Sequence, residues 1–229
     1  MATKDEILTR LLKEENYVSG EELARQTGVS RAAVWKAIKS LKKSGYDIEG
    51  VTKCGYKLKQ NNSLVTAEGV KALLEKDIEV THFDTVDSTN TYCKRLLADG
   101  KQGEFLVTAA KQTAGRGRQG KSFYSPSETG IYFSLVIRPD TSLQNAVTAT
   151  TAAAVAVCKA IEKTTDLKPK IKWVNDVYLN GKKVCGILTE ATTDFESGTV
   201  DSVIIGIGIN ISTTKFPSDV QAQVALMLM

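Results

Sequence analysis

The chain has 229 residues, of which 42% are hydrophobic, 7% aromatic and 24% charged. This composition is typical of an ordinary globular protein and excludes the disordered and fibrous classes. No apolar run reaches the ~18 residues of a membrane span, and the N-terminal MATKDE is charged where a signal peptide would turn apolar. Four cysteines without paired spacing argue against a disulfide framework and a zinc site. We expect a soluble, cytoplasmic protein that is long enough for two domains.

The net charge of +4 is concentrated in the first quarter of the chain. Residues 25–60 contain nine basic side chains and only two acidic ones, whereas residues 61–229 contain equal numbers of each. Such a local excess is typical of a surface that binds a polyanion. Charge alone leaves the alternative of a solvated helix face open.

Periodicity and capping signals in residues 1–60 predict a winged helix-turn-helix domain. Apolar residues at helical spacing predict helices at 4–17, 20–27 and 31–43, with Ser19 and Ser30 as N-caps. Short strands at 46–49 and 55–58 would form the wing. Residues at the start of the third helix and on the wing are expected to contact DNA: Ser30, Arg31, Ala32, Trp35, Lys36, Lys39 and Lys53. The alternative is a three-helix interaction module in which Trp35 belongs to the core.

The polar tetrapeptide Gln60-Asn61-Asn62-Ser63 predicts a linker at 61–64, and residues 65–229 predict a second domain. Helices are expected at 66–76, 89–98 and 142–164. Strands are expected at 78–86, 104–112, 130–138, 170–173, 177–179, 182–192 and 200–211. Asn180-Gly181 is typical of a type I′ hairpin turn. Strands joined by hairpins, with the helices on one side, predict an α+β fold with a mixed sheet.

A glycine-rich loop, GRGRQGK at 115–121, matches the G-x-G-x-x-G pattern. A dinucleotide-binding site needs a helix directly after the loop, and the following KSFYSP cannot start one. The loop carries three cations, Arg116, Arg118 and Lys121, between glycines that allow close backbone approach. It therefore predicts a flap that closes over a phosphorylated or adenylated ligand, with a surface loop that binds nothing as the alternative.

Three further clusters carry polar or small residues. Lys172 to Asp176, with Lys183 and Gly186, suit a Mg²⁺-bound phosphoryl group, although a turn and a hairpin charge explain these residues better when each is taken alone. Ser88-Thr89-Asn90 at a helix N-terminus suits a polar head group or carboxylate, with simple capping as the alternative. Gly206 and Gly208 share one strand face, which allows a helix or a flat ligand to pack closely.

Taken in order from about Ser19 to Ile211, these motifs resemble those of bifunctional biotin protein ligases that double as biotin-operon repressors. Mild departures are Val174, Gln119, Lys121 and Phe123. The resemblance implies a winged helix-turn-helix joined to a class II synthetase-like mixed-sheet domain. It also implies a reaction in which biotin and MgATP form biotinyl-5′-AMP and a lysine of a biotin carrier protein then takes the biotin. The adenylate-bound homodimer would bind operator DNA, with the adenylate as corepressor.

The resemblance also assigns roles to individual residues. It gives substrate contacts to Ser88, Thr89, Asn90, Gln112, Gly115, Arg116, Gly117, Arg118, Lys172, Lys183, Gly186, Gly206 and Asn210. Among these, Arg116, Arg118 and Lys183 would be catalytic. Asn175 and Asp176 would serve the nucleotide, with Asp176 near Mg²⁺.

Relatives in this family continue into a small C-terminal β-barrel domain, which we expect this chain to lack. This expectation keeps a second function open, namely a repressor that binds biotin or its adenylate without efficient transfer. A lipoate or octanoyl transferase is a third option, weakened by the Gly-Arg-Gly-Arg loop and the winged helix.

Overall fold

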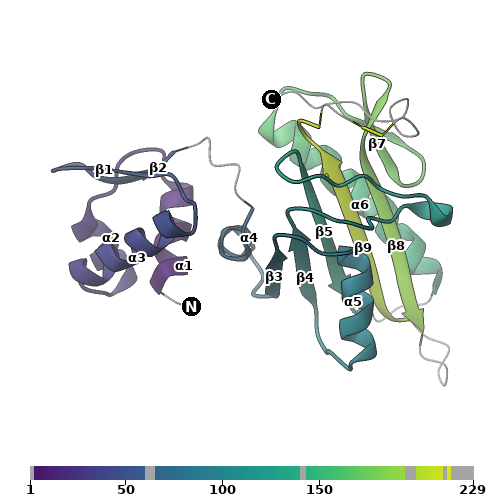
Figure 1. The fold of residues 1–229 in the computed structure, drawn as a ribbon, viewed down its shortest axis with the longest axis horizontal. Helices are drawn as coiled ribbons and strands as arrows, with labels where there is room; N and C mark the ends of the chain where they lie inside the picture. Colours follow the sequence, from purple (N-terminus) through teal and green to yellow (C-terminus); the bar gives the residue numbers. More distant parts are fainter. Residues whose placement is uncertain (1–2, 60–64, 140–142, 194–199, 214–215, 218–229) are drawn as a thin grey trace. The chain divides into compact units, whose positions relative to one another are not determined.

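A computed structural model describes residues 3–59, 65–139, 143–193, 200–213 and 216–217, with only the backbone at 143–147. The chain divides into two compact units, residues 1–77 and 78–229 (Figure 1). Within the described residues, no helix is both long and apolar enough to cross a lipid bilayer.

The first unit contains the predicted helix-turn-helix and wing. Its helices are α1 (Thr3–Lys13), α2 (Gly20–Thr27), α3 (Arg31–Lys43) and α4 (Ala67–Leu73), and its hairpin pairs β1 (Ile48–Val51) with β2 (Gly55–Leu58). The side chains of Ser19 and Ser30 accept hydrogen bonds from Glu22 N at 3.0 Å and Ala33 N at 3.2 Å, which confirms both predicted N-caps. The turn after α2 uses Gly28 at φ 68°.

Several predicted boundaries in this unit were wrong. The first helix ends at Lys13 and not at Tyr17. The first wing strand begins at Ile48 and not at Tyr46. Tyr46 N donates to Leu41 O at 3.1 Å, so the backbone of Tyr46 caps the C-terminal end of α3.

Helix α4, which we had assigned to the second domain, belongs to the first compact unit. Its Glu68 pairs with Lys4 of α1 at 3.1 Å, and its N-cap Thr66 is hydrogen-bonded to the Tyr46 hydroxyl. α4 ends at Leu73 and not at Lys76. The predicted linker at 61–64 lies outside the described residues, and the domain boundaries remain a prediction.

The second unit is built on a seven-stranded sheet with the order β3-β4-β5-β9-β8-β7-β6 (Figure 1). The strands are β3 (Glu79–Phe83), β4 (Phe105–Ala109), β5 (Gly130–Ile137), β6 (Lys170–Lys172), β7 (Asp176–Leu179), β8 (Lys182–Thr193) and β9 (Val200–Asn210). β3 and β4 are parallel and all other pairs are antiparallel, so the predicted mixed sheet is confirmed.

The helices α5 (Thr89–Ala98) and α6 (Leu143–Thr164) pack on opposite faces of this sheet, and the expectation of helices on one side was wrong. Side chains alternate between the faces of a strand. In β9, Ile204 packs in the cluster that contains Cys93 of α5, whereas Val203 and Ile205 pack in the cluster that contains residues of α6. Gly206 and Gly208 therefore share the α5 face.

The connection from β7 to β8 is the predicted type I′ turn. Asn180 has φ 50° and Gly181 has φ 77°, and positive φ at both central residues defines this turn. β3 and β4 are shorter than predicted, because pairing beyond them continues only as an isolated bridge between Val86 and Gln112. Ser142, which we expected to open the long helix, lies outside the described residues.

Candidate functional site

A polar pocket lies on the α5 face of the large sheet. The N-terminus of α5, the glycine-rich loop and strands β8 and β9 contribute to its wall. Its lining comprises Ser88, Thr89, Asn90, Gln112, Arg116, Gly117, Arg118, Phe123, Asn175, Lys183, Gly186, Ile187, Leu188, Gly206, Ile207 and Gly208. Eleven of these residues are among those the sequence proposed for the site.

The inner end of the pocket is neutral and hydrogen-bonded. Ser88 caps α5 through Thr91 N at 3.4 Å. Gln112 Oε1 accepts from Thr89 N at 2.9 Å, and Gln112 Nε2 donates to Ser125 Oγ at 2.9 Å. These buried amides and hydroxyls suit a small polar group without net charge, because a buried charge would require a partner of opposite sign.

The glycines of β8 and β9 are required by what packs on them. A Cβ at Gly206 would lie 2.1 Å from Asn90 Oδ1, and a Cβ at Gly208 would lie 2.3 Å from the Phe123 ring. At Gly186 the same ring would lie 3.0 Å away. The close packing of a helix that these glycines predicted therefore occurs, because Asn90 of α5 packs on Gly206, while Gly208 is covered by the Phe123 ring and the alternative of a flat ligand stays a prediction.

The glycine-rich loop folds back on itself and is not followed by a helix, as expected. Phe123 N donates to Gly115 O at 2.8 Å, and Gly117 N donates to Lys121 O at 2.7 Å. Arg118 Nη1 donates to Asn175 Oδ1 at 3.0 Å, which ties the loop to the β6–β7 connection. The arginines of the loop therefore lie where they can reach an anion in the pocket.

A second hollow adjoins the first and is more strongly charged. The two hollows share Gly117, Arg118, Phe123, Asn175 and Lys183, and the second adds Gln119, Lys121, Ser122 and Asp176. Lys183 Nζ lies 2.7 Å from Asp176 Oδ1. The pair places both a cation and a carboxylate beside the loop.

Asp176 provides a single carboxylate for a metal. No group of three His, Cys, Asp or Glu side chains suited to a metal occurs among the described residues. Mg²⁺ in nucleotide sites typically takes one or two carboxylates and completes its shell with water and phosphate oxygens. The residues present therefore fit a metal that arrives with a phosphate ligand.

Three predicted site residues do not line either hollow. Gly115 packs against the backbone, since a Cβ there would lie 2.3 Å from Phe123 O. Lys172 lies on the edge strand β6, with Nζ 5.1 Å from the centre of the Tyr178 ring. Asn210 is buried at the end of β9, where Thr213 Oγ1 donates to its Oδ1 at 3.4 Å.

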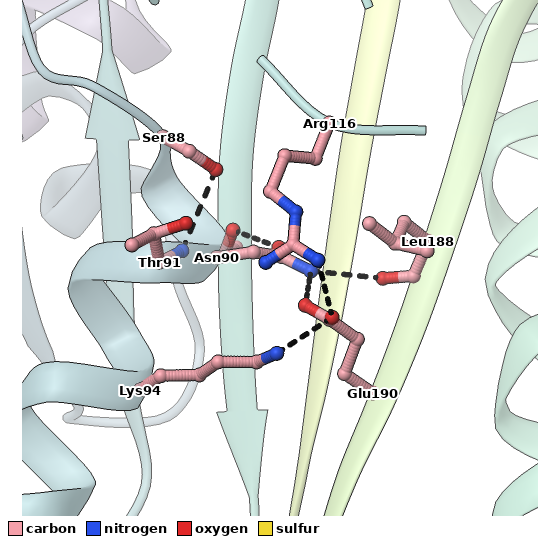
Figure 2. Close-up of polar contacts among 8 residues, drawn as sticks. Ser88, Asn90, Thr91, Lys94, Arg116, Leu188 and Glu190 are labelled. Atoms are coloured by element: carbon pink, nitrogen blue, oxygen red, sulfur yellow. Dashed lines mark hydrogen bonds and ion pairs between the residues drawn. The ribbon is translucent and has the colours of Figure 1, made fainter. Parts of the chain in front are cut away.

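Two residues that the sequence reasoning did not assign to the site prove central to it. Phe123 lines both hollows. Glu190 lies beside the pocket (Figure 2). Its carboxylate oxygens lie 2.7 Å from Lys94 Nζ, 3.7 Å from Arg116 Nη2 and 2.9 Å from Asn90 Nδ2. The sequence could have indicated Glu190 only as a lone acidic residue inside an apolar strand, on the same strand face as Leu188.

The contacts of Glu190 keep it ionised. Burial alone would raise its pKa, but the hydrogen bonds from Lys94 and Asn90 and the charges of Lys94 and Arg116 outweigh burial. Its pKa is therefore below the ordinary value of 4.5.

In the first unit, every residue proposed for DNA contact is exposed. Trp35 is 55% exposed, which excludes the core position considered for it. Residues of the start of α2, of α3 and of the wing line a common groove: Ser19, Gly20, Glu21, Arg31, Ala32, Trp35, Gly50, Val51, Thr52, Lys53, Gly55 and Tyr56. Lys39 Nζ lies 5.2 Å from the centre of the Trp35 ring, so a cation and an aromatic face are presented together.

The fold and site define an α+β domain with a cationic flap over a polar pocket, on a chain that also carries a helix-turn-helix. The model of the Biotin/lipoate A/B protein ligase family matches residues 82–210, and an HTH domain matches residues 3–57. The chain belongs to the biotin/lipoate A/B protein ligase family.

Two similar proteins carry the description "Bifunctional ligase/repressor BirA". The protein from Bacillus spizizenii is 39% identical over 210 residues, which cover 90% of this chain and 64% of that protein. The protein from Escherichia coli is 32% identical over 216 residues, which cover 94% of this chain and 66% of that protein. The chain thus spans just under two thirds of the length of these relatives.

Solved structures show the same fold. The biotin protein ligase from Aquifex aeolicus in complex with biotin and ATP is 30% identical with a TM-score of 0.53, covering 65% of this chain and 59% of that one. The biotin protein ligase from Leishmania major in complex with biotin is 25% identical with a TM-score of 0.54, covering 66% of this chain and 64% of that one.

Proposed function

We propose that this protein is a biotin protein ligase that also represses transcription in response to biotin. The first activity would join biotin to ATP, giving biotinyl-5′-AMP and pyrophosphate, and then transfer biotin to a lysine of a biotin carrier protein. The observation that carries the proposal is the pair of adjoining hollows, which share Arg118 and Lys183, while the first also has an uncharged, hydrogen-bonded end at Ser88, Thr89 and Gln112.

The two hollows match the two parts of an adenylated vitamin. The uncharged ring of biotin suits the neutral end near Ser88, Thr89 and Gln112. The carboxylate of biotin and the α-phosphate of ATP suit the region that Arg118 and Lys183 share. Arg116, Arg118 and Lys183 would offset the negative charge that builds up as the carboxylate attacks phosphorus.

Asn175 and Asp176 are placed for the nucleotide. Asn175 Nδ2 donates to Asp176 Oδ1 at 3.0 Å, and this oxygen also faces Lys183. We propose that Asp176 contributes one oxygen to the Mg²⁺ that accompanies ATP. The flap would exclude water from the mixed anhydride until the acceptor amine arrives.

The first unit would bind operator DNA. Exposed basic and small residues at the start of α3, together with Lys53 on the wing, suit major-groove and phosphate contacts. We propose that the adenylate-bound form is a homodimer, because two helix-turn-helix units can then match a two-fold operator. The cysteines are free, which supports a reducing compartment, the cytoplasm.

The test follows each step with radiolabelled ATP. The protein is incubated with biotin and MgATP, the adenylate is separated by chromatography, and an acceptor domain is then added. Labelled biotinyl-5′-AMP that disappears as the acceptor gains biotin supports the ligase. An adenylate that forms but is never transferred supports the ligand-sensing repressor instead, and no adenylate with biotin contradicts the ligase. Lipoate in place of biotin distinguishes the two substrate classes of the family.

A further inference from the structure

The Glu190 carboxylate accepts a hydrogen bond from Asn90 (Figure 2). From Asn90, buried hydrogen bonds continue through Ser134 to Thr89, which lines the ligand pocket. Asn90 Nδ2 lies 2.9 Å from Glu190 Oε2 and 3.2 Å from Leu188 O. Both oxygens can only accept, since one belongs to an ionised carboxylate and the other to a backbone carbonyl. The amide nitrogen of Asn90 must therefore face Glu190, and its Oδ1 must face the opposite way.

On that opposite side, Asn90 Oδ1 lies 2.6 Å from the hydroxyl oxygen of Ser134. Ser134 is fully buried, and its hydroxyl has one proton, which it donates in a hydrogen bond to Asn90 Oδ1. Ser134 Oγ also lies 2.7 Å from Thr89 Oγ1. Because the Ser134 proton is already committed, Thr89 has to donate its own hydroxyl proton to Ser134.

With Thr89 donating to Ser134 and Ser134 donating to Asn90, every buried group in this row of hydrogen bonds has a partner. Thr89 Oγ1 also lies 3.2 Å from Gln112 Oε1, which has a second lone pair besides the one that accepts from the Thr89 backbone N–H at 2.9 Å, but this contact is longer than the 2.7 Å to Ser134 Oγ. The reverse direction would leave Asn90 Oδ1 without a donor, and a buried acceptor without a partner costs about 1–3 kcal/mol. Thr89 lines the pocket. Because its hydroxyl proton is donated to Ser134, the hydroxyl offers only lone pairs to a ligand.

We propose that Glu190 is a positioning residue of the ligand site: by fixing the Asn90 amide, it makes Thr89 a hydrogen-bond acceptor toward the ligand. A ligand group that reaches Thr89 then has to donate. The ring of biotin is a cyclic urea with two N–H donors, whereas the dithiolane ring of lipoate has none. Glu190 thereby favours the urea ring without touching it. This inference rests on the proposed function.

The same carboxylate also restrains the flap, since Arg116 Nη2 lies 3.7 Å from it. The low pKa of Glu190 agrees with a carboxylate that stays ionised and accepts at neutral pH. Lys94, at 2.7 Å, supplies most of the compensating charge. Lys101, whose Nζ pairs with Glu79 at 2.7 Å, takes no part in this hydrogen-bond chain, which makes it a useful control position.

The test measures KM for biotin and for ATP in adenylate formation by the full chain. In Glu190→Leu we expect KM for biotin to rise about tenfold or more, the size of one lost hydrogen bond, while KM for ATP changes less than twofold. Glu190→Gln should restore most of the biotin affinity, because its amide oxygen can still accept from Asn90. Lys101→Met should change KM for biotin less than twofold.

A double-mutant cycle with Ser134→Ala tests the path itself. If Glu190 acts through Asn90 and Ser134, the double variant should lose little more biotin affinity than the single variant that loses more on its own. If Glu190→Leu does not fold, the cycle is run with Glu190→Ala. Full additivity, or a rise in both KM values together, would overturn the inference.

The selectivity of the adenylation site between biotin and lipoate is the remaining readout. Competition between biotin and lipoate for the adenylation site should shift toward lipoate in Glu190→Leu, and an unchanged ratio counts against the inference. Failure of the wild-type chain to form any adenylate would refute the proposed function. Normal wild-type activity with an unaltered Glu190→Leu variant would refute this inference alone.

Discussion

Replacement of Gly206 by alanine tests the packing that shapes the pocket. The new Cβ would lie 2.1, 2.8 and 3.0 Å from Oδ1, Cγ and Nδ2 of Asn90. Favourable carbon contacts lie near ~3.5–4.0 Å, so the Asn90 amide would have to move by more than about 1 Å. That movement would break its contacts to Ser134 and Glu190.

The cost combines two effects. Overpacking in a buried site costs about 1–3 kcal/mol, and unpairing a buried polar group costs about 1–3 kcal/mol. We expect Gly206→Ala to lose about 3 kcal/mol in the free energy of unfolding, which corresponds to a fall in Tm of roughly 6–12 °C for a unit of this size. Biotin affinity should fall at least about tenfold, because the displaced amide no longer orients Thr89.

Calorimetry and biotin titration measure both effects, with Gly186→Ala as a graded comparison. A Cβ at Gly186 would meet the Phe123 ring at 3.0 Å and the movable end of Lys183 at 3.2 Å, so the stability loss should be smaller. The reasoning is refuted if Gly206→Ala unfolds at the wild-type temperature and binds biotin normally.

Three further predictions concern the separate parts of the chain. Lys183→Gln should slow adenylate formation about 10²–10³-fold while leaving affinity for duplex DNA unchanged; equal adenylation by the variant would contradict the assigned role. Arg31→Ala should weaken DNA binding and reduce the salt dependence by about one unit of slope, and any matching loss of adenylate formation would count against independent units. Burial raises the pKa of Cys93 and Cys185 to about 12, so both thiols stay protonated at pH 8 and resist a thiol reagent, whereas the exposed Cys54 reacts quickly. Loss of the fast phase in Cys54→Ser would check this assignment, and rapid labelling of the buried pair in the folded protein would contradict it.

Features set by neighbouring residues were predictable from the sequence. The caps at Ser19 and Ser30 and the turn at Asn180-Gly181 depend on a few adjacent residues, and all three are confirmed. The flap without a following helix was predictable for the same reason, because Pro126 and the residues before it cannot start a helix.

Features set by distant contacts were not predictable in this way. The placement of α5 and α6 on opposite faces depends on how β9 alternates within the sheet. The Asn90–Glu190 contact joins residues 100 positions apart. A single chain shows no sign of such a pairing, so Glu190 could be noticed only as an acidic residue in an apolar strand.

The central claim is that the two adjoining hollows bind biotin and nucleotide side by side. Biotin-dependent exchange of labelled pyrophosphate into ATP tests it most directly, because exchange requires both ligands to react within one site. The account predicts exchange that requires biotin and falls at least about 100-fold in Lys183→Gln. Exchange that is absent with biotin, or that persists undiminished in this variant, would contradict it.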